Sequence, residues 1–225
     1  MTDSLPTSVR TVRQRLQEAA RRAGRDPSSI RLIGASKRRT IEEIQTAHAL
    51  GIQHFGENYV PECLDKARQL DTADFHFIGH LQRNKAKRLL AGNINWVHTV
   101  DTLRLAKTLQ RYRERPLHTL IQVNIGGEPT KSGVAPDAVL ELARTIFAEC
   151  PDIGLCGLMT LPPKDNNPTR WFQALADLRN TIQSELGVPL PELSMGMSSD
   201  LEPAVACGAT MVRVGTALFG PRPIH

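Results

Sequence analysis

Aromatic residues are scarce in this chain: they make up 4% of its 225 residues. The core must therefore be built mainly from Leu, Ile, Val, Ala and Met. No apolar run approaches the ~20 residues that a membrane-spanning helix requires. The first ten residues also lack the apolar segment of a secretory signal peptide. These absences argue against membrane and exported classes, and we expect a cytoplasmic protein.

Cysteine is rare as well, and its spacing argues against two kinds of site. The four cysteines form no CxxC pair, and no histidine stands at metal-ligand spacing from them. We therefore expect neither a zinc site nor a disulfide framework, but reduced and mostly buried side chains. They are Cys63, Cys150, Cys156 and Cys207.

The charge balance is mildly basic, with 28 Lys and Arg against 23 Asp and Glu, which gives a net charge of +5. Several arginines crowd the N-terminal segment: Arg10, Arg13, Arg15, Arg21, Arg22 and Arg25. We interpret them as the solvated face of an amphipathic helix. The alternative is an RNA-binding or scaffold role, which predicts salt-sensitive binding to oligonucleotides.

The rest of the composition is that of a globular protein, with 40% hydrophobic and 23% charged residues. The length suits a single domain over residues 1–225. Residues 7–24 have apolar side chains at three- and four-residue spacing, which predicts a helix. Short apolar runs then alternate with helical segments. The predicted strands span 31–37, 52–58, 75–80, 96–100, 118–125, 155–161, 192–197 and 211–220.

This strict alternation requires parallel strand pairing with right-handed crossovers. Eight such units predict an α/β protein, a single (β/α)8 TIM-type barrel with an extra N-terminal helix. The rival is a doubly wound open sheet, but the chain lacks a GxGxxG fingerprint after its first strand. Two capping-box patterns, Thr40 with Glu43 and Ser199 with Glu202, predict helix starts.

In such a barrel, reactive side chains stand at the carboxyl ends of the strands. Lys37 ends the first predicted strand, which is unusual because burial of an ammonium group is costly. Lys37 is a candidate Schiff-base lysine, and its neighbours Arg38 and Arg39 would favour the neutral amine. The alternative is a lysine in the following loop that reaches water.

Small and hydroxyl residues follow the last two strands. The segment from Ser194 to Ser199 precedes a predicted helix, and Gly215-Thr216 lies near the end of the last strand. Barrels often bind phosphate at these two places, and helix N-termini attract anions. The sequence therefore predicts a phosphate site here. Arg213 shares a strand face with Gly215 and is expected to point at the ligand, the alternative being a salt bridge in the barrel mouth.

Three histidines lie near strand ends without a visible partner in the sequence. They are His76, His80 and His98. We interpret them as structural or surface groups rather than as general bases.

Taken in order, several short motifs resemble the pyridoxal phosphate homeostasis protein family, which are stand-alone barrels of the alanine-racemase-like fold. The resemblance runs from residue 31 to residue 220, and its motifs are specific in this order rather than singly. They are Ala35 to Lys37, Phe55 to Tyr59, His76 to Gly79, Leu81 to Lys85, Gln122 to Ile125, Lys131 to Gly133, Gly157 to Met159, Leu193 to Ser198 with Asp200, and Met211 to Thr216 with Phe219-Gly220.

The resemblance implies that pyridoxal 5′-phosphate (PLP) is held as a covalent Schiff base on Lys37. It also implies phosphate contacts in the two loops after the last strands, an arginine at the pyridine nitrogen and an asparagine in the pocket. The implied cofactor-binding residues are Lys37, Asn58, Ser194, Arg213, Gly215 and Thr216. It implies no metal site.

The same resemblance argues against strong catalysis. PLP is an effective electron sink when its ring nitrogen is protonated and paired with a carboxylate, whereas Arg213 only donates hydrogen bonds. Racemases of this fold take a second base, a tyrosine, from an added β-domain that we expect this chain to lack. Tyr112 lies in a predicted helix and Tyr59 follows the second strand, where packing is the simpler interpretation. We therefore expect no catalytic residue.

We expect the protein to bind, buffer and deliver PLP to PLP-dependent apoenzymes, with indirect effects on amino-acid metabolism. Lys131 and Lys85 are candidate secondary PLP lysines. We further expect a monomer that binds neither membranes nor nucleic acid. Two enzymatic functions stay open. One is that of a weak PLP-dependent racemase, and the other is that of a class I aldolase-type barrel in which Lys37 attacks a sugar phosphate directly.

Overall fold

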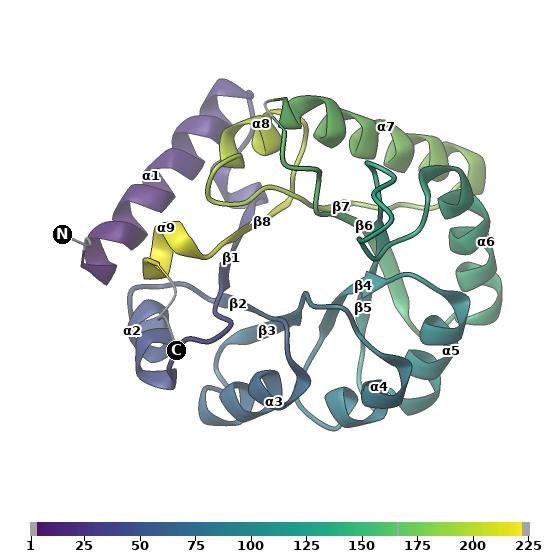
Figure 1. Ribbon diagram of the computed structural model, residues 1–225, viewed down its shortest axis with the longest axis horizontal. Helices are drawn as coiled ribbons and strands as arrows, with labels where there is room; N and C mark the ends of the chain where they lie inside the picture. The colour runs from purple at the N-terminus through teal and green to yellow at the C-terminus, as the bar shows by residue number, and fades with distance from the viewer. Residues whose placement is uncertain (1–3, 166, 222–225) are drawn as a thin grey trace.

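The computed structural model describes residues 4–165 and 167–221. Its eight strands pair in chain order, and the last pairs with the first, so the sheet closes into a parallel barrel. Figure 1 shows the helices as a ring around these strands, which confirms the predicted α/β barrel. The strands are β1 (Arg31–Ala35), β2 (His54–Glu57), β3 (Asp74–Phe77), β4 (Trp96–Val100), β5 (His118–Val123), β6 (Gly154–Thr160), β7 (Glu192–Ser194) and β8 (Met211–Val214).

A helix precedes β1, and helices follow every strand. The extra N-terminal helix α1 (Leu5–Arg22) is confirmed, shifted by two residues from the expected 7–24, with a proline in its first turn. The others are α2 (Ile41–Ala49), α3 (Val60–Gln69), α4 (Arg83–Leu90), α5 (Leu103–Tyr112), α6 (Val139–Glu149), α7 (Pro168–Leu186), α8 (Leu201–Ala206) and α9 (Thr216–Phe219). Two short 3₁₀ turns are η1 (Pro27–Ser29) and η2 (Pro136–Ala138).

The last predicted strand was too long. Residues 211–220 do not form one strand, because β8 ends at Val214 and α9 occupies the following residues. The backbone leaves the extended region at Gly215, where φ is −110° and ψ is −77°. An apolar run such as this one does not distinguish a strand from a short buried helix.

One of the two predicted capping boxes is also wrong. Thr40 and Glu43 make both reciprocal bonds at the start of α2, as predicted. Ser199, in contrast, is not the cap of α8, because Asp200 occupies that position. The Asp200 carboxylate accepts a hydrogen bond from the Met197 backbone N–H at 2.5 Å, so it closes the preceding loop instead of capping the helix.

Apolar side chains form two separate clusters. The larger fills the layer between the barrel and the helices, whereas the smaller lies inside the barrel and has four buried members: Ile33, Leu120, Met159 and Met211. Barrel interiors are usually filled by branched apolar side chains. Here, buried polar side chains share that interior: His76, His98, Ser194 and Arg213. The inside of this barrel is therefore partly polar.

The arginines of the N-terminal segment divide into two groups. Arg13 donates to the carbonyl that precedes β2, and Arg15 forms an ion pair with α8. Arg25 donates to two carbonyls at and after the end of α8. The remaining arginines of α1 are exposed. Arg13 and Arg15 thus fasten α1 to its neighbours, and Arg25 fastens the segment after it, so part of this basic character has a structural cause.

Two further features bear on the class of protein. Among the residues that the structure describes, no helix has both the length and the hydropathy needed to cross a membrane. The four cysteines are free thiols, two of them buried and two partly buried.

Candidate functional site

A cavity of about 550 Å³ opens where β1 and β8 end. Four of the predicted site residues line it together: Lys37, Arg213, Gly215 and Thr216. Ser198 and Ser199, from the loop after β7, also line it. This is the carboxyl end of the barrel, where barrels of this type place their functional groups.

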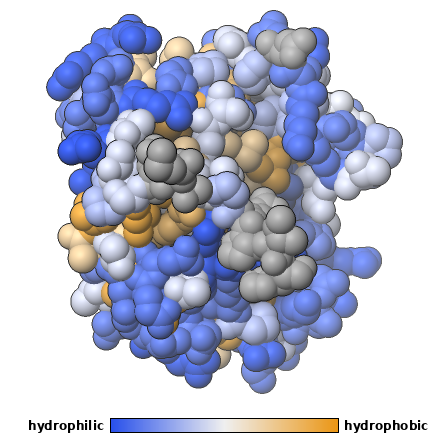
Figure 2. Space-filling view, turned by 60° about the vertical axis from the view of Figure 1, so that its left-hand side comes forward, coloured by the Kyte–Doolittle hydropathy of each residue, from blue (hydrophilic) through white to orange (hydrophobic). Residues whose placement is uncertain are grey.

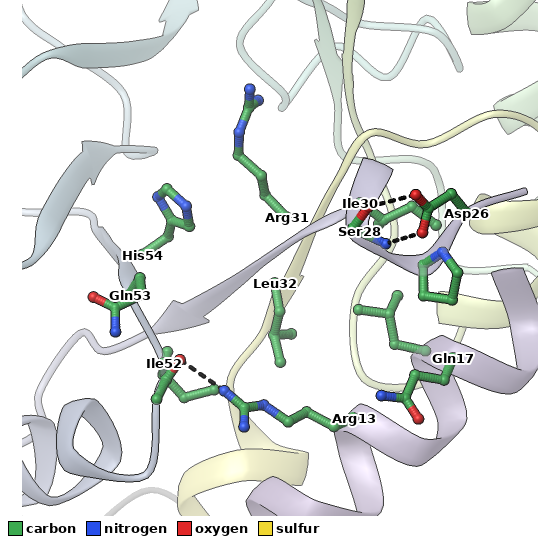
Figure 3. A pocket seen from close by; sticks show the side chains of 13 residues that line it. Arg13, Gln17, Asp26, Ser28, Ile30, Arg31, Leu32, Ile52, Gln53 and His54 are labelled. Atoms are coloured by element: carbon green, nitrogen blue, oxygen red, sulfur yellow. Dashed lines mark hydrogen bonds between the residues drawn. The ribbon is translucent and has the colours of Figure 1, made fainter.

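A second cavity of about 580 Å³ lies at the opposite end of the barrel. It is bounded by α1 and by the amino ends of β1 and β2, and Figure 3 shows Arg31 and His54 beside the same open space. Arg31 already pairs with Glu192, at 2.7 Å, and Arg13 with the Gly51 carbonyl. The cavity at the carboxyl ends is therefore the candidate site.

Lys37 stands in a tight turn between β1 and α2. The Arg39 N–H donates to the Ser36 carbonyl at 3.0 Å and closes this turn. Arg38 has a φ of +61°, the one non-glycine residue in the described chain with a positive φ, and its N–H donates to Glu62 at 2.5 Å. Such backbone strain persists only where the surroundings hold it. The turn therefore fixes where the Lys37 side chain begins.

A buried ion cluster supports this turn from α3 and β2. The ammonium group of Lys66, which is 5% exposed, donates to the Ser36 carbonyl at 2.7 Å and to Glu57 at 2.7 Å. It also pairs with Glu62 at 2.5 Å, and the Ser36 hydroxyl donates to Glu57 at 2.6 Å. Burial raises the pKa of the Glu57 carboxyl, although Lys66 opposes that rise. The residue before Lys37 is thus held by two elements.

Arg213 supplies a buried cation to the cavity. It is 3% exposed, and its Nη1 and Nη2 donate to the Ser194 hydroxyl at 2.5 Å and to the Thr160 carbonyl at 2.8 Å. Burial lowers its pKa to about 10, against the attraction of Asp200, so the guanidinium remains charged at neutral pH. Because arginine has five donors and no acceptor, any group that it meets in the cavity must accept a hydrogen bond.

Hydroxyl groups and close backbone surround the other side of the site. The Ser198 hydroxyl accepts from the Ala217 N–H at 3.2 Å and so connects the loop after β7 to α9. A side-chain carbon at Gly215 would be in van der Waals contact with the Ala35 carbonyl oxygen at 3.4 Å, so the end of β1 lies directly beside this position. The helices α8 and α9 have only six and four residues. Anion binding would therefore depend on local hydroxyl and N–H donors more than on a helix dipole.

The structure does not bring the other two predicted residues into this cavity. Ser194 is fully buried, and its hydroxyl bonds to Arg213 and His98 inside the barrel. Asn58 lines a neighbouring cavity of about 180 Å³, together with Gly79 and Lys131. Contact between these residues and a ligand stays a prediction.

The two candidate secondary lysines differ in their surroundings. The Lys131 ammonium donates to the Leu161 and Pro162 carbonyls and pairs with Glu128. Lys85 is exposed on α4. Neither lines the cavity that contains Lys37.

Sequence reasoning missed two groups that the structure places near the site. Lys66 and Glu57 gave no signal, because nothing in the sequence shows that a lysine of α3 is buried. A hydrogen-bonded row of three histidines, His54, His76 and His98, did leave a signal in the sequence. Successive histidines are 22 residues apart, which is about the length of one strand-helix unit here. That regular spacing predicts neighbouring positions on adjacent strands.

Comparisons with known proteins agree with this geometry. Residues 8–223 match the family model described as alanine racemase, N-terminal domain. The chain is thus an alanine-racemase-type barrel.

Closer relatives give a narrower family. The pyridoxal phosphate homeostasis protein of Pseudomonas aeruginosa is 41% identical over 224 residues, which covers 97% of this chain and 96% of that protein. The one from Aquifex aeolicus is 43% identical over 219 residues, covering 94% and 95%. A solved structure of PipY from Synechococcus elongatus with PLP bound is 32% identical, with a TM-score of 0.79, and covers 91% of this chain and all of that one. This chain belongs to the pyridoxal phosphate homeostasis protein family.

Proposed function

We propose that this protein binds PLP in the cavity between β1 and β8 and acts in intracellular PLP homeostasis by binding, buffering and delivering the cofactor. The main observation is that Lys37 and Arg213 line one cavity with Ser198, Ser199 and Thr216. PLP supplies an aldehyde that condenses with a primary amine, with loss of water, to a reversible Schiff base. The PLP-bound PipY structure supports this assignment.

The residues present fit the three functional groups of PLP. Lys37 offers the amine, and Arg213 offers N–H donors to the pyridine nitrogen, which is an acceptor. The phosphate fits the hydroxyl-rich side formed by Ser198, Ser199 and Thr216 next to Gly215. In this arrangement Ser194 acts on the cofactor through Arg213, and Asn58 reaches the cofactor's edge from the neighbouring cavity.

We assign the protein as a carrier rather than an enzyme. Arg213 donates only, so it keeps the pyridine nitrogen unprotonated and the cofactor a weak electron sink. Both tyrosines lie outside the cavity lining. Tyr59 is 49% exposed at the start of α3, and Tyr112 ends α5 beside Lys87 and Arg111. The site therefore offers no tyrosine as a second base.

The recipients in this proposal are PLP-dependent apoenzymes, and effects on amino-acid metabolism follow from cofactor supply. We place the protein in the cytoplasm, in line with its four free thiols, which suit a reducing compartment.

The first test is the visible absorption spectrum of the purified protein with PLP, followed by borohydride reduction and peptide mapping. We expect a phosphopyridoxyl adduct on Lys37 and loss of the absorption band in Lys37→Ala. Lys85→Ala is the matched control, because it removes an exposed lysine outside the cavity and should leave the adduct unchanged. Labelling of many surface lysines, or no adduct, would overturn the proposal.

A second test separates carrier from enzyme. The protein with PLP is incubated with alanine in deuterated water, and exchange at the α-carbon is followed by NMR. A carrier gives exchange no faster than free PLP. Exchange that is faster, and that disappears in Lys37→Ala, would instead identify a weak PLP-dependent enzyme.

A further inference from the structure

A continuous row of hydrogen bonds crosses the barrel interior from β2 to β8. His54 Nδ1 lies 3.1 Å from His76 Nε2, and His76 Nδ1 lies 2.9 Å from His98 Nε2. His98 Nδ1 lies 2.9 Å from the Ser194 hydroxyl, which accepts from Arg213 at 2.5 Å. We call these five residues the interior chain. His54 lines the cavity shown in Figure 3, and Arg213 lines the candidate cofactor cavity, so the interior chain joins the two ends of the barrel.

The direction of the interior chain follows from its donors. Arg213 has no acceptor, so the Ser194 oxygen must accept from it, and the single proton of that hydroxyl is directed at His98 Nδ1. A neutral His98 then has its proton on Nε2 and donates to His76 Nδ1. By the same argument His76 donates from Nε2 to His54 Nδ1. All donors therefore point away from Arg213.

Their burial and their hydrogen bonds favour the neutral form of His76 and His98. Burial lowers the pKa of His76 and His98 well below the ordinary value, and Arg213 lowers that of His98 further. Four other titratable or charged groups face the row. Arg31 and His118 act on His76, Asp74 lies 3.5 Å from His54, and Asp200 faces Arg213. A proton on His98 Nδ1 would also displace the Ser194 proton and add a second positive charge beside the guanidinium.

Ser194 is the adjustable partner of Arg213. The other partner, the Thr160 carbonyl, belongs to the backbone of β6 and is fixed by strand pairing. A serine hydroxyl rotates, and it presents a lone pair to Arg213 only while its proton is directed elsewhere. His98 Nδ1 gives that proton its direction, and His76 keeps His98 in the required tautomer.

We propose that His98 and His76 are positioning residues for Arg213: together they hold the Ser194 hydroxyl as an acceptor and so fix the guanidinium toward the cofactor cavity. This inference rests on the proposed function in one respect, namely that the ligand of Arg213 is the PLP ring nitrogen. If His98 acted by packing alone, an apolar side chain of similar size would replace it without loss. Apolar replacement of a buried polar network is often neutral for stability.

The first experiment needs neither PLP nor a variant of the site. Two-dimensional ¹⁵N NMR of the histidine rings in the cofactor-free protein reports which nitrogen is protonated. We expect His76 and His98 to have the proton on Nε2 from about pH 8 to about pH 5.5, with no titration near the ordinary value of about 6.5. A proton on Nδ1, or titration in that range, would overturn the direction of the interior chain.

The second experiment compares two substitutions in the PLP-loaded protein. His98→Asn keeps an oxygen near the Nδ1 position that accepts from Ser194, whereas His98→Leu removes the acceptor and fills more of the space. We expect His98→Asn to keep the absorption band of the Lys37 adduct and its pH dependence. We expect His98→Leu to shift the band and to weaken PLP binding about tenfold, the size of one lost hydrogen bond to a charged group.

The outcomes separate this inference from the function on which it rests. If wild type forms no Lys37 adduct, the proposed function fails, while the NMR result still decides the direction of the interior chain. If wild type forms the adduct and both variants match it, the positioning role is wrong. If His98→Asn is more impaired than His98→Leu, packing and not hydrogen bonding is the role of His98.

Discussion

At the scale of single residues, the support of Lys37 depends on one buried ammonium group. Lys66 joins the Ser36 carbonyl to two carboxylates, and Glu57 beside it is fully buried, with its Oε2 atom unpaired in the structure. Removal of one partner of a buried ion pair leaves an uncompensated charge, which costs much more than loss of a surface pair.

We predict that Lys66→Met lowers the free energy of unfolding by about 3–5 kcal/mol at neutral pH. Burial already raises the pKa of Glu57, and loss of Lys66 removes the attraction that opposes this rise. An acid whose folded-state pKa is raised stabilises the fold at low pH and loses that contribution as pH rises. The deficit relative to wild type should therefore be larger at about pH 8 than at about pH 5. Urea unfolding at both pH values measures it.

The matched control for this prediction is the double variant Lys66→Met with Glu57→Gln. It removes the fully buried carboxylate and leaves only that of Glu62, whose side chain is partly exposed. The double variant should therefore regain much of the lost stability and show a flatter pH dependence. A double variant as unstable as Lys66→Met would show that the ion cluster contributes through packing instead.

At the scale of elements, closure of the barrel depends on how closely β6 and β7 approach. Gly157 pairs with Glu192, and a side-chain carbon built at Gly157 would overlap the Glu192 carbonyl oxygen. This contact is with backbone, which cannot rotate away. The strand β7 has only three residues and contributes Ser194, so a displaced β7 would also displace the acceptor of Arg213.

We predict that Gly157→Ala destabilises the protein by at least about 1–3 kcal/mol, because overpacking forces a backbone shift. Gly154→Ala, on the same strand, is the control: its nearest atom would be the Leu117 carbonyl at 3.3 Å, so a much smaller loss is expected. Thermal and urea unfolding of the two variants are compared. Equal losses would contradict the proposed close approach of β6 and β7.

At the scale of the whole molecule, the described surface exposes few large hydrophobic side chains. Within the described chain, only two large hydrophobic side chains are exposed, Tyr59 and Leu161, at 49% and 38%. On the face shown in Figure 2, hydrophilic residues dominate and hydrophobic ones form small separate areas. Stable interfaces between copies usually bury larger apolar patches.

We therefore predict that the protein sediments as a monomer of 24.9 kDa, with and without PLP. Analytical ultracentrifugation at several protein concentrations measures this directly. The same samples with a labelled RNA oligonucleotide test the RNA-binding role of the basic helix, for which we expect no complex at physiological salt. A dimer at micromolar concentration, or salt-sensitive RNA binding, would contradict this view of the surface.

The sequence by itself determined the architecture and the main residues of the cavity. Strict alternation of apolar runs and helical segments predicts a parallel sheet with right-handed crossovers. The count of eight units and the missing GxGxxG fingerprint then favoured a closed barrel over an open sheet. Functional side chains of such barrels lie at the carboxyl ends of the strands, which predicted that Lys37, Arg213, Gly215 and Thr216 share one cavity. Local signals failed where two structures compete over a few residues, as after Val214 and at Ser199.

Only the tertiary structure decided what surrounds those residues. The bond between His98 and Ser194 joins positions 96 residues apart, and it exists because the barrel closes and turns both side chains inward. Likewise, Lys66 supports Ser36 only because α3 packs beside the turn after β1. Hydrogen bonds of this kind depend on distances of about 3 Å between elements. Residue patterns fix which elements form, whereas packing of the closed barrel fixes which side chains meet.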